Sequence, residues 1–151
     1  MMPNKNLLEN PISDLAFIKS LLPHREPMLM VDGLSFYNDS KSVSQLTISG
    51  ENLFVENNLF AEAGLIEHMA QSAALMIGYK YHIQNLPIRE GFIAAIKNLK
   101  IDRLPHINDR ISSTVEITYE LANMTNVKIV TKLTDYVLAS AEMTLVLKEN
   151  E

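Results

Sequence analysis

The sequence predicts an α+β fold in which a long antiparallel sheet wraps around one central helix. Residues from about 62 to 82 are apolar on nearly every side, which is typical of a buried helix. Residues 111–121 and 137–147 alternate apolar and polar side chains, which is typical of strands with one buried face. A helix without a polar face must be enclosed, and a sheet with one apolar face can enclose it.

A single domain over residues 1–151 is expected, because no linker or internal repeat interrupts the chain. A short helix at about 13–22 should begin at Ser13 and Asp14 and stop before Pro23. The central helix carries small residues four apart, at Ala70, Ala74 and Gly78, where another element can approach closely. Six strands are expected, at residues 28–37, 41–49, 92–101, 111–121, 127–133 and 137–147.

Composition excludes several classes of function. The net charge of −5 and the lack of a basic cluster argue against nucleic-acid binding. No apolar run is long enough for a membrane span, and the first residues lack the pattern of a secretory signal, so we expect a cytoplasmic protein. The chain has no cysteine and no metal-ligand spacing, and it lacks a phosphate-binding glycine loop and a GxSxG motif. We therefore expect no metal and no cofactor.

Glu67 is the outlier of the central helix. A carboxylate in an apolar helix costs several kcal/mol unless it is paired, and such groups cluster at functional sites. Gln71 follows one turn later on the same face and is placed to hydrogen-bond Glu67. Glu67 is the candidate acid/base residue. The alternative is a structural carboxylate satisfied by backbone amides or by a partner subunit.

Free amides near Gly64 and Leu65, at the start of the central helix, suit a carbonyl oxygen that gains negative charge. We therefore expect Gly64, Leu65 and Gln71 to border the substrate. His68 adjoins Glu67 in sequence but projects about 100° around the helix, so we expect it at an interface rather than beside the substrate. His24 leads into the first strand, and this position does not indicate where its side chain points.

Three segments together resemble the FabZ-type 3-hydroxyacyl-carrier-protein dehydratases, which have the hotdog fold. Residues 21–32 resemble the family's LPHRxPfLLVD opening, and residues 67–71 resemble its EAMAQ helix, with Glu67 at the catalytic glutamate. Residues 93–111 resemble its pGDxL segment, where Asn108 replaces a glycine. Asparagine tolerates left-handed backbone geometry, so this replacement is mild.

The chain departs from that family at one important place. The family's catalytic histidine lies in an HFPG loop, which here corresponds to residues 53–56, Leu-Phe-Val-Glu. A divergent branch associated with aryl polyene and flexirubin pigment synthesis also lacks HFPG but keeps a GIEYMAQ-like helix. Residues 64–71 are similar to that motif. The resemblance therefore implies acyl-carrier-protein substrates more directly than it implies the usual pair of catalytic residues. No histidine lies between His24 and His68, so His24 is the candidate for the missing catalytic partner of Glu67; the alternative is a structural role at the entrance to the first strand.

The resemblance implies dehydration of a 3-hydroxyacyl thioester to the trans-2-enoyl thioester, with the acyl chain linked through phosphopantetheine to an acyl carrier protein. It implies a homodimer or higher oligomer, or a heteromer with another hotdog subunit. Alternatives are a hotdog acyl thioesterase and a catalytically weak partner subunit that binds acyl carrier protein. We expect Met69, Met76 and Phe92 to wall an acyl tunnel. A basic rim for the acidic carrier is expected at Arg89, Lys97, Lys100 and Arg103.

Overall fold

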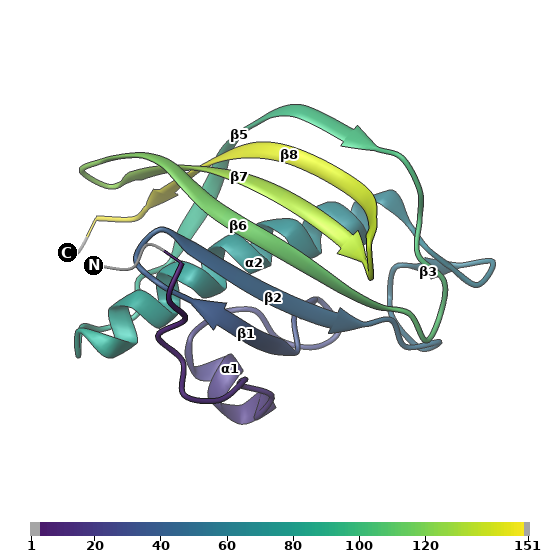
Figure 1. Ribbon diagram of the computed structural model, residues 1–151, viewed down its shortest axis with the longest axis horizontal. Coiled ribbons are helices and arrows are strands. Elements are labelled where there is room, and N and C mark those ends of the chain that lie inside the picture. The colour runs from purple at the N-terminus through teal and green to yellow at the C-terminus, as the bar shows by residue number, and fades with distance from the viewer. Residues whose placement is uncertain (1–3, 150–151) are drawn as a thin grey trace.

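The computed structural model describes residues 4–149 and has the predicted α+β architecture, a curled sheet around a long helix (Figure 1). Of the predicted domain, residues 1–3 and 150–151 lie outside the described part. The elements in chain order are α1 (Leu15–Ser20), β1 (Gly33–Tyr37), β2 (Lys41–Thr47), β3 (Val55–Glu56), β4 (Leu59–Phe60), α2 (Glu62–Ile83), β5 (Gly91–Ile101), β6 (Arg110–Leu121), β7 (Met124–Leu133) and β8 (Tyr136–Leu147).

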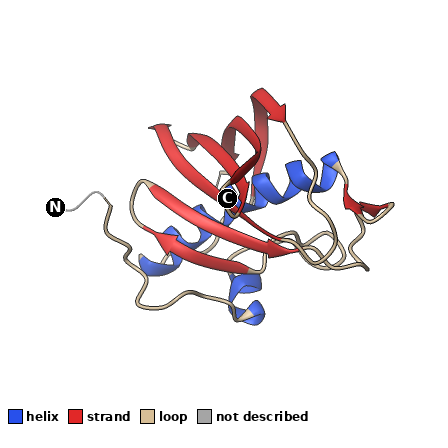
Figure 2. Cartoon of the chain, turned by 45° about the vertical axis from the view of Figure 1, so that its right-hand side comes forward, coloured by secondary structure: helices blue, strands red, loops and turns tan. Residues whose placement is uncertain are grey.

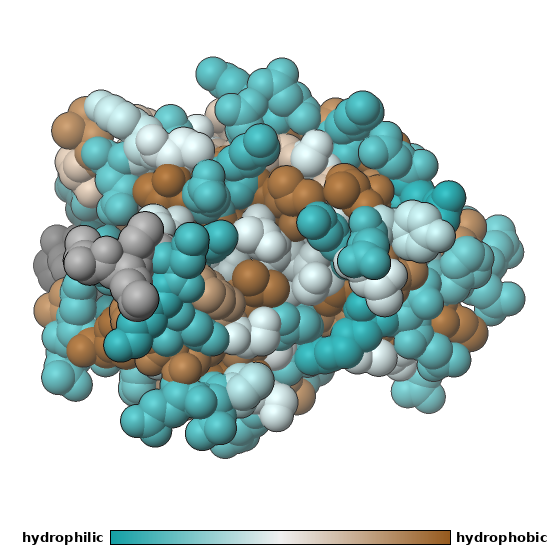
Figure 3. Space-filling view, in the orientation of Figure 1, coloured by the Kyte–Doolittle hydropathy of each residue, from teal (hydrophilic) through white to brown (hydrophobic). Residues whose placement is uncertain are grey.

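The six longer strands form one antiparallel sheet in the order β1-β2-β6-β7-β8-β5. The strands β1 and β5 are therefore the two edges. Figure 2 shows the sheet bending around α2, and Figure 3 shows that hydrophilic side chains cover much of the face seen in Figure 1, with hydrophobic ones between them. No helix of residues 4–149 has both the length and the apolar character that crossing a membrane requires.

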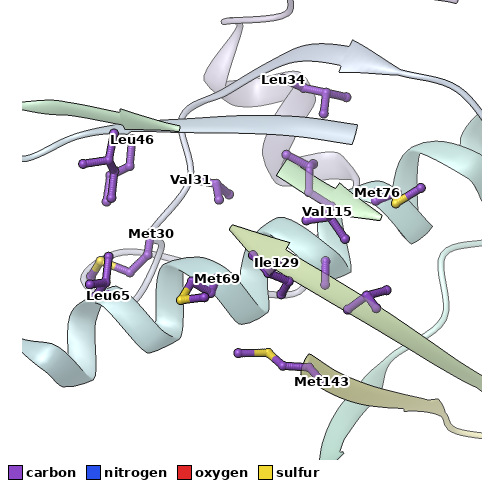
Figure 4. Close-up of a cluster of buried hydrophobic side chains, with 14 of the residues drawn as sticks. Met30, Val31, Leu34, Leu46, Leu65, Met69, Met76, Val115, Ile129 and Met143 are labelled. Carbon is purple, nitrogen blue, oxygen red and sulfur yellow. The ribbon is translucent and has the colours of Figure 1, made fainter. Parts of the chain in front are cut away.

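The core lies between α2 and the concave face of the sheet. In Figure 4, Leu65 and Met69 of α2 lie near Met30 and Ile129, and Leu65, Met69 and Ile129 are fully buried. Alternation along β6 and β7 follows the predicted period of two, since every second residue from 111 to 115 and from 127 to 131 is buried. The helix that lacks a polar face is thus enclosed by the apolar face of the sheet.

Two elements near the N-terminus are shorter than the sequence predicts. Helix α1 covers Leu15–Ser20, with the Asp14 side chain accepting a hydrogen bond from the Ala16 amide and Leu21 as its C-cap. Strand β1 begins at Gly33 rather than at residue 28. Residues 28–30 are excluded from the strand because their polar groups bond to side chains of α2, as described below.

A two-residue hairpin joins β3 to β4, which the sequence analysis missed. Asn57 and Asn58 both have positive φ values, 53° and 65°, as the central residues of a type I′ turn require. The dipeptide Asn-Asn was the available signal. Asn108 also adopts a positive φ of 72°, in agreement with the prediction that asparagine can replace a glycine there.

Gly78 is where α1 and α2 approach most closely. A Cβ atom at residue 78 would lie 2.2 Å from the Leu21 carbonyl oxygen, which belongs to the backbone and cannot rotate away. The predicted close approach along the small-residue face is therefore made by the end of α1. It holds the segment that follows α1 against the central helix.

Replacing Gly78 with alanine is expected to destabilise the fold by about 1–3 kcal/mol, because the new methyl group clashes with backbone. Helix propensity alone predicts the opposite sign, a gain of about 1 kcal/mol. Urea denaturation measures the change. Gly50→Ala is the matched control, since a Cβ there meets nothing within 4 Å. A more stable Gly78→Ala variant would contradict the close contact.

Candidate active site

A cavity of about 160 Å³ lies between α2, the end of α1 and the edge of the sheet. One face of α2 supplies Glu67, Ala70, Ala74, Ile77, Gly78 and Tyr81. Opposite them lie residues 21–24 after α1, residues 88–93 leading into β5, and Leu145 and Leu147 of β8. From Glu67 to Tyr81 this helical face rises by 14 steps, or about 21 Å at 1.5 Å per residue. Small side chains on this face leave room for an extended ligand.

Glu67 lies on the cavity wall, and its carboxyl is held by Gln71. The Gln71 amide nitrogen Nε2 donates to Glu67 Oε1 at 2.9 Å, so the hydrogen bond that the i, i+4 spacing predicted is present. The Glu67 side chain remains 31% exposed. The carboxyl is therefore partly shielded and still accessible from the cavity.

Both hydrogens and the oxygen of the Gln71 side-chain amide take part in hydrogen bonds. Besides Glu67, Nε2 donates to the Met28 carbonyl at 2.7 Å, and Oε1 accepts from the Met30 amide at 2.6 Å. Turning the amide over would place its NH₂ group against the Met30 N–H, so these partners fix its orientation. The side chain is fully buried. Gln71 therefore orients Glu67 and does not line the cavity.

His24 is the imidazole nearest to Glu67. Its Nε2 lies 4.0 Å from Glu67 Oε1, and both side chains line the cavity. Burial lowers the pKa of His24 below 6.5; the charge of Glu67 opposes this shift, and Arg25 adds to it. The buried Nδ1 has no hydrogen-bond partner within the described residues. The structure thus brings together the two residues that the sequence analysis named as candidate catalytic groups, although they are 43 positions apart.

His68 is fully buried and points away from the cavity. Its Nδ1 lies 2.7 Å from the Met30 carbonyl oxygen, and its Nε2 lies 2.9 Å from Ser113 Oγ on β6. Burial lowers its pKa from 6.5 to about 4, and the hydrogen bond to Met30 only partly offsets this effect. The interface at which His68 packs is the one between α2 and the sheet of the same chain.

Gly64 and Leu65, which were expected to border the substrate, do not line the cavity. Gly64 is buried where the Phe54 and Phe60 side chains approach; a Cβ there would lie 2.5 Å from Phe54 Cβ. The Leu65 amide donates to the Ala61 carbonyl at 3.1 Å, and its side chain is in the core. The first-turn hydrogen bond therefore leaves the Leu65 amide unavailable to a ligand in this chain.

Only some of the residues that were expected to wall an acyl tunnel or to form a basic rim line the cavity. Phe92 and Arg89 line it, whereas Met69 and Met76 are in the core. The helix face that carries Met69 is turned to the sheet, so its side chain packs there. Lys97 and Lys100 lie exposed along β5, and the Arg103 guanidinium lies over the Tyr136 ring. No group of three His, Asp or Glu side chains within residues 4–149 is arranged to hold a metal ion.

Ser113 and Thr131 were not predicted from the sequence. Both are fully buried, and a hydrogen bond of 2.6 Å joins their hydroxyl oxygens. They are register partners on β6 and β7. Both stand at inward positions of strands whose other inward residues are apolar. That break in the alternation was the available signal.

Lowering the pH from about 6.5 to about 4 is expected to remove up to about 3 kcal/mol of stability through His68. The pKa of His68 is 6.5 when unfolded and about 4 when folded, so the unfolded chain binds the extra proton. The stabilisation is complete above pH 6.5 and is lost as the pH falls toward 4. Urea titrations across this range, on the wild type and His68→Asn, isolate the effect. Equal pH slopes for the two proteins would contradict it.

Comparisons with known proteins identify the family of the chain. The model of the ApeP-like family, described as ApeP dehydratase, matches residues 16–150. The 3-hydroxyacyl-[acyl-carrier-protein] dehydratase FabZ of Levilactobacillus brevis is 28% identical over 137 residues, covering 87% of this chain and 90% of that protein.

Solved structures share the hotdog fold. The dehydratase heterocomplex ApeI:P from Xenorhabdus doucetiae matches with a TM-score of 0.82 at 14% identity, covering 88% of this chain and 91% of that one. A hypothetical thioesterase with coenzyme A from Streptococcus pneumoniae matches with a TM-score of 0.61 at 9% identity, covering 78% and 86%. At these identities the structures show the fold alone. Because the family model spans nearly all of the described residues, the chain belongs to the ApeP-like dehydratase family, as its resemblance to FabZ-type enzymes predicted.

Proposed function

We propose that the protein removes water from a 3-hydroxyacyl thioester carried by an acyl carrier protein and forms the trans-2-enoyl thioester. The observation that carries the proposal is the pair of His24 and Glu67, 4.0 Å apart, at one part of an apolar cavity. Membership of a dehydratase family supports the same reaction. The FabZ relatives, whose names give acyl-carrier-protein substrates, support the carrier.

The cavity suits an extended acyl chain. Its α2 wall includes Ala70 and Ala74, whose small side chains leave room along the helix. Apolar side chains, among them Ile77 and Phe92, complete much of its lining. A hydrocarbon chain placed there loses its contact with water, which favours binding. The polar end of the substrate then lies beside His24 and Glu67.

Both proton transfers of the reaction fall to this pair. A substrate atom can lie about 2.8 Å from each of two groups that are 4.0 Å apart. We propose that neutral His24 takes the proton from C2 while the Glu67 carboxyl gives a proton to the C3 hydroxyl. The C3–O bond breaks, C2 and C3 form a double bond, and water leaves. The proton then passes from His24 to Glu67. Gln71 holds Glu67 in place throughout.

Thioester hydrolysis is the rival reaction, because the fold also occurs in a hypothetical thioesterase. The two reactions give different products from the same carrier-bound substrate. Dehydration lowers the mass of the acyl carrier protein by one water and leaves the thioester intact. Hydrolysis releases a free thiol. Mass spectrometry of the carrier with a thiol assay therefore separates dehydratase from thioesterase, and a protein that gives neither product but binds the carrier would be a partner subunit.

Replacing Glu67 with glutamine is expected to lower the dehydration rate by about 10² to 10⁴, the usual range for a general acid or base. Glutamine keeps the shape of the side chain but cannot donate an acidic proton. The matched control is Glu62→Gln, an exposed carboxylate in the first turn of the same helix. Turnover of the 3-hydroxyacyl carrier protein measures both, and circular dichroism checks the fold.

His24→Asn is measured in the same experiment, and its dehydration rate is expected to fall by a similar factor, about 10² to 10⁴. Wild-type rates in both the Glu67 and His24 variants would exclude this pair as the catalytic groups. If turnover falls only in Glu67→Gln, the Glu67 carboxyl remains a catalytic group and the His24 imidazole is excluded as one.

We further propose that the chain assembles through β5, with a second copy or with another hotdog subunit. Strand β5 is an edge strand, so one side of its backbone has no strand partner in the sheet. It also exposes large apolar side chains: Phe92 is 54% exposed, Ile96 42% and Leu99 40%. Exposed apolar groups beside an unpaired strand favour association. The similarity to the dehydratase heterocomplex ApeI:P of Xenorhabdus doucetiae supports a second hotdog subunit as partner.

Replacing Ile96 with lysine is expected to shift the assembly toward monomer, because it places a charge in the contact. Light scattering after size-exclusion chromatography measures the mass, alone and mixed with a second hotdog subunit. Leu121→Lys is the matched control, since Leu121 is also exposed but lies at the end of β6. A monomeric wild type that neither self-associates nor binds a second subunit would contradict the proposal.

A further inference from the structure

We infer that His68 is a positioning residue of the active site, whose imidazole holds residues 28–30 in the conformation that lets Gln71 orient Glu67. The inference deepens the proposed function and rests on it. His68 itself does not line the cavity, so it acts only through the segment and Gln71. Its role follows from three observations on the buried hydrogen bonds around it.

The first observation fixes the proton on the imidazole. The Met30 carbonyl oxygen can only accept, so the Nδ1 atom 2.7 Å away carries the hydrogen. A neutral imidazole then presents Nε2 as an acceptor, and Ser113 Oγ donates to it at 2.9 Å. Thr131 Oγ1 in turn donates to Ser113 Oγ at 2.6 Å. The three hydrogen bonds form one directed chain, Thr131 to Ser113 to His68 to Met30.

The second observation is that this chain is enclosed. His68, Ser113 and Thr131 are each fully buried. A leucine at residue 68 would fill much of the same space without removing a polar ring from water, and it would leave the Met30 carbonyl and Ser113 without these partners. The buried imidazole therefore contributes directed hydrogen bonds that an apolar side chain does not supply.

The third observation links the chain to the catalytic carboxyl. Met30 is held on both of its backbone polar groups, its carbonyl by His68 and its amide by Gln71. His68 and Gln71 are three residues apart on α2, so they reach the same segment from neighbouring turns. The other bonds of the Gln71 amide go to Met28 and to Glu67. A shift of the segment therefore changes the partners that orient Gln71, and with them the position of the Glu67 carboxyl.

Two variants of His68 test the role. His68→Leu removes the donor to Met30 and is expected to lower kcat by about 10- to 100-fold, the scale of a catalytic group displaced by about 1 Å, with KM changed less than about two-fold. His68→Asn keeps a side-chain N–H near the position of Nδ1 and is expected to recover part of kcat. The control is Ile129→Val, a fully buried change on β7 that leaves these hydrogen bonds intact; it should keep wild-type kcat.

Two measurements on the folded protein do not depend on activity. Nitrogen-15 NMR of the wild type should show His68 as the neutral tautomer with the proton on Nδ1. Hydrogen exchange of the Met30 amide should be faster in His68→Leu than in Ile129→Val. A proton on Nε2, or wild-type kcat and wild-type Met30 exchange in His68→Leu, would overturn the inference.

These measurements also separate this inference from the proposed function. If His68→Leu does not fold, the tautomer and the rescue by asparagine still decide the question. A wild type without dehydratase activity, but with the expected tautomer and protected Met30 amide, would overturn the proposed reaction while supporting the role of His68 in holding the segment.

Discussion

The active-site arrangement depends on one buried side-chain amide, that of Gln71. It bonds to the Met28 carbonyl and to the Met30 amide, the two groups on one side of an extended chain that a neighbouring strand would normally take. The amide thereby takes the place of a strand partner for residues 28–30, which precede β1. Its remaining hydrogen holds Glu67. The same group therefore ties residues 28–30 to the central helix and sets the position of the Glu67 carboxyl.

Much of the fold could be predicted because its signals are local. The apolar character of α2 and the alternation along β6 and β8 each appear within one segment, and a helix wrapped by a sheet satisfies both. The prediction of a strand from residue 28 was wrong because a side chain of α2 replaces the strand partner, which no local pattern reveals. The β3–β4 hairpin was missed because each strand has only two residues, too few to show alternation.

In the candidate site, too, the features with a local signal in the sequence could be predicted and the others could not. Glu67 stood out as a charge in an apolar helix, and its bond to Gln71 followed from helix geometry. The pairing of His24 with Glu67 was predicted from the family resemblance and from the lack of any histidine between His24 and His68. A contact between residues 43 positions apart leaves no local pattern in the sequence. The helix begins at Glu62, as predicted, so Leu65 is its fourth residue and its amide bonds to the carbonyl of the N-cap residue Ala61. Only the amides that precede Leu65 lie within the first turn without an intrahelical acceptor.

The burial of the methionines bears on how the protein withstands oxidants. With no cysteine in the chain, methionine sulfur is its main site of reversible oxidation. Met30, Met69, Met76 and Met143 are nearly inaccessible in the core (Figure 4), so the folded state shields them. Met28 is 38% exposed, and its carbonyl is one of the groups that Gln71 holds. Among the methionines of residues 4–149, sulfoxide formation would therefore begin at Met28, and enzymatic reduction of its sulfoxide would reverse the change without unfolding the core.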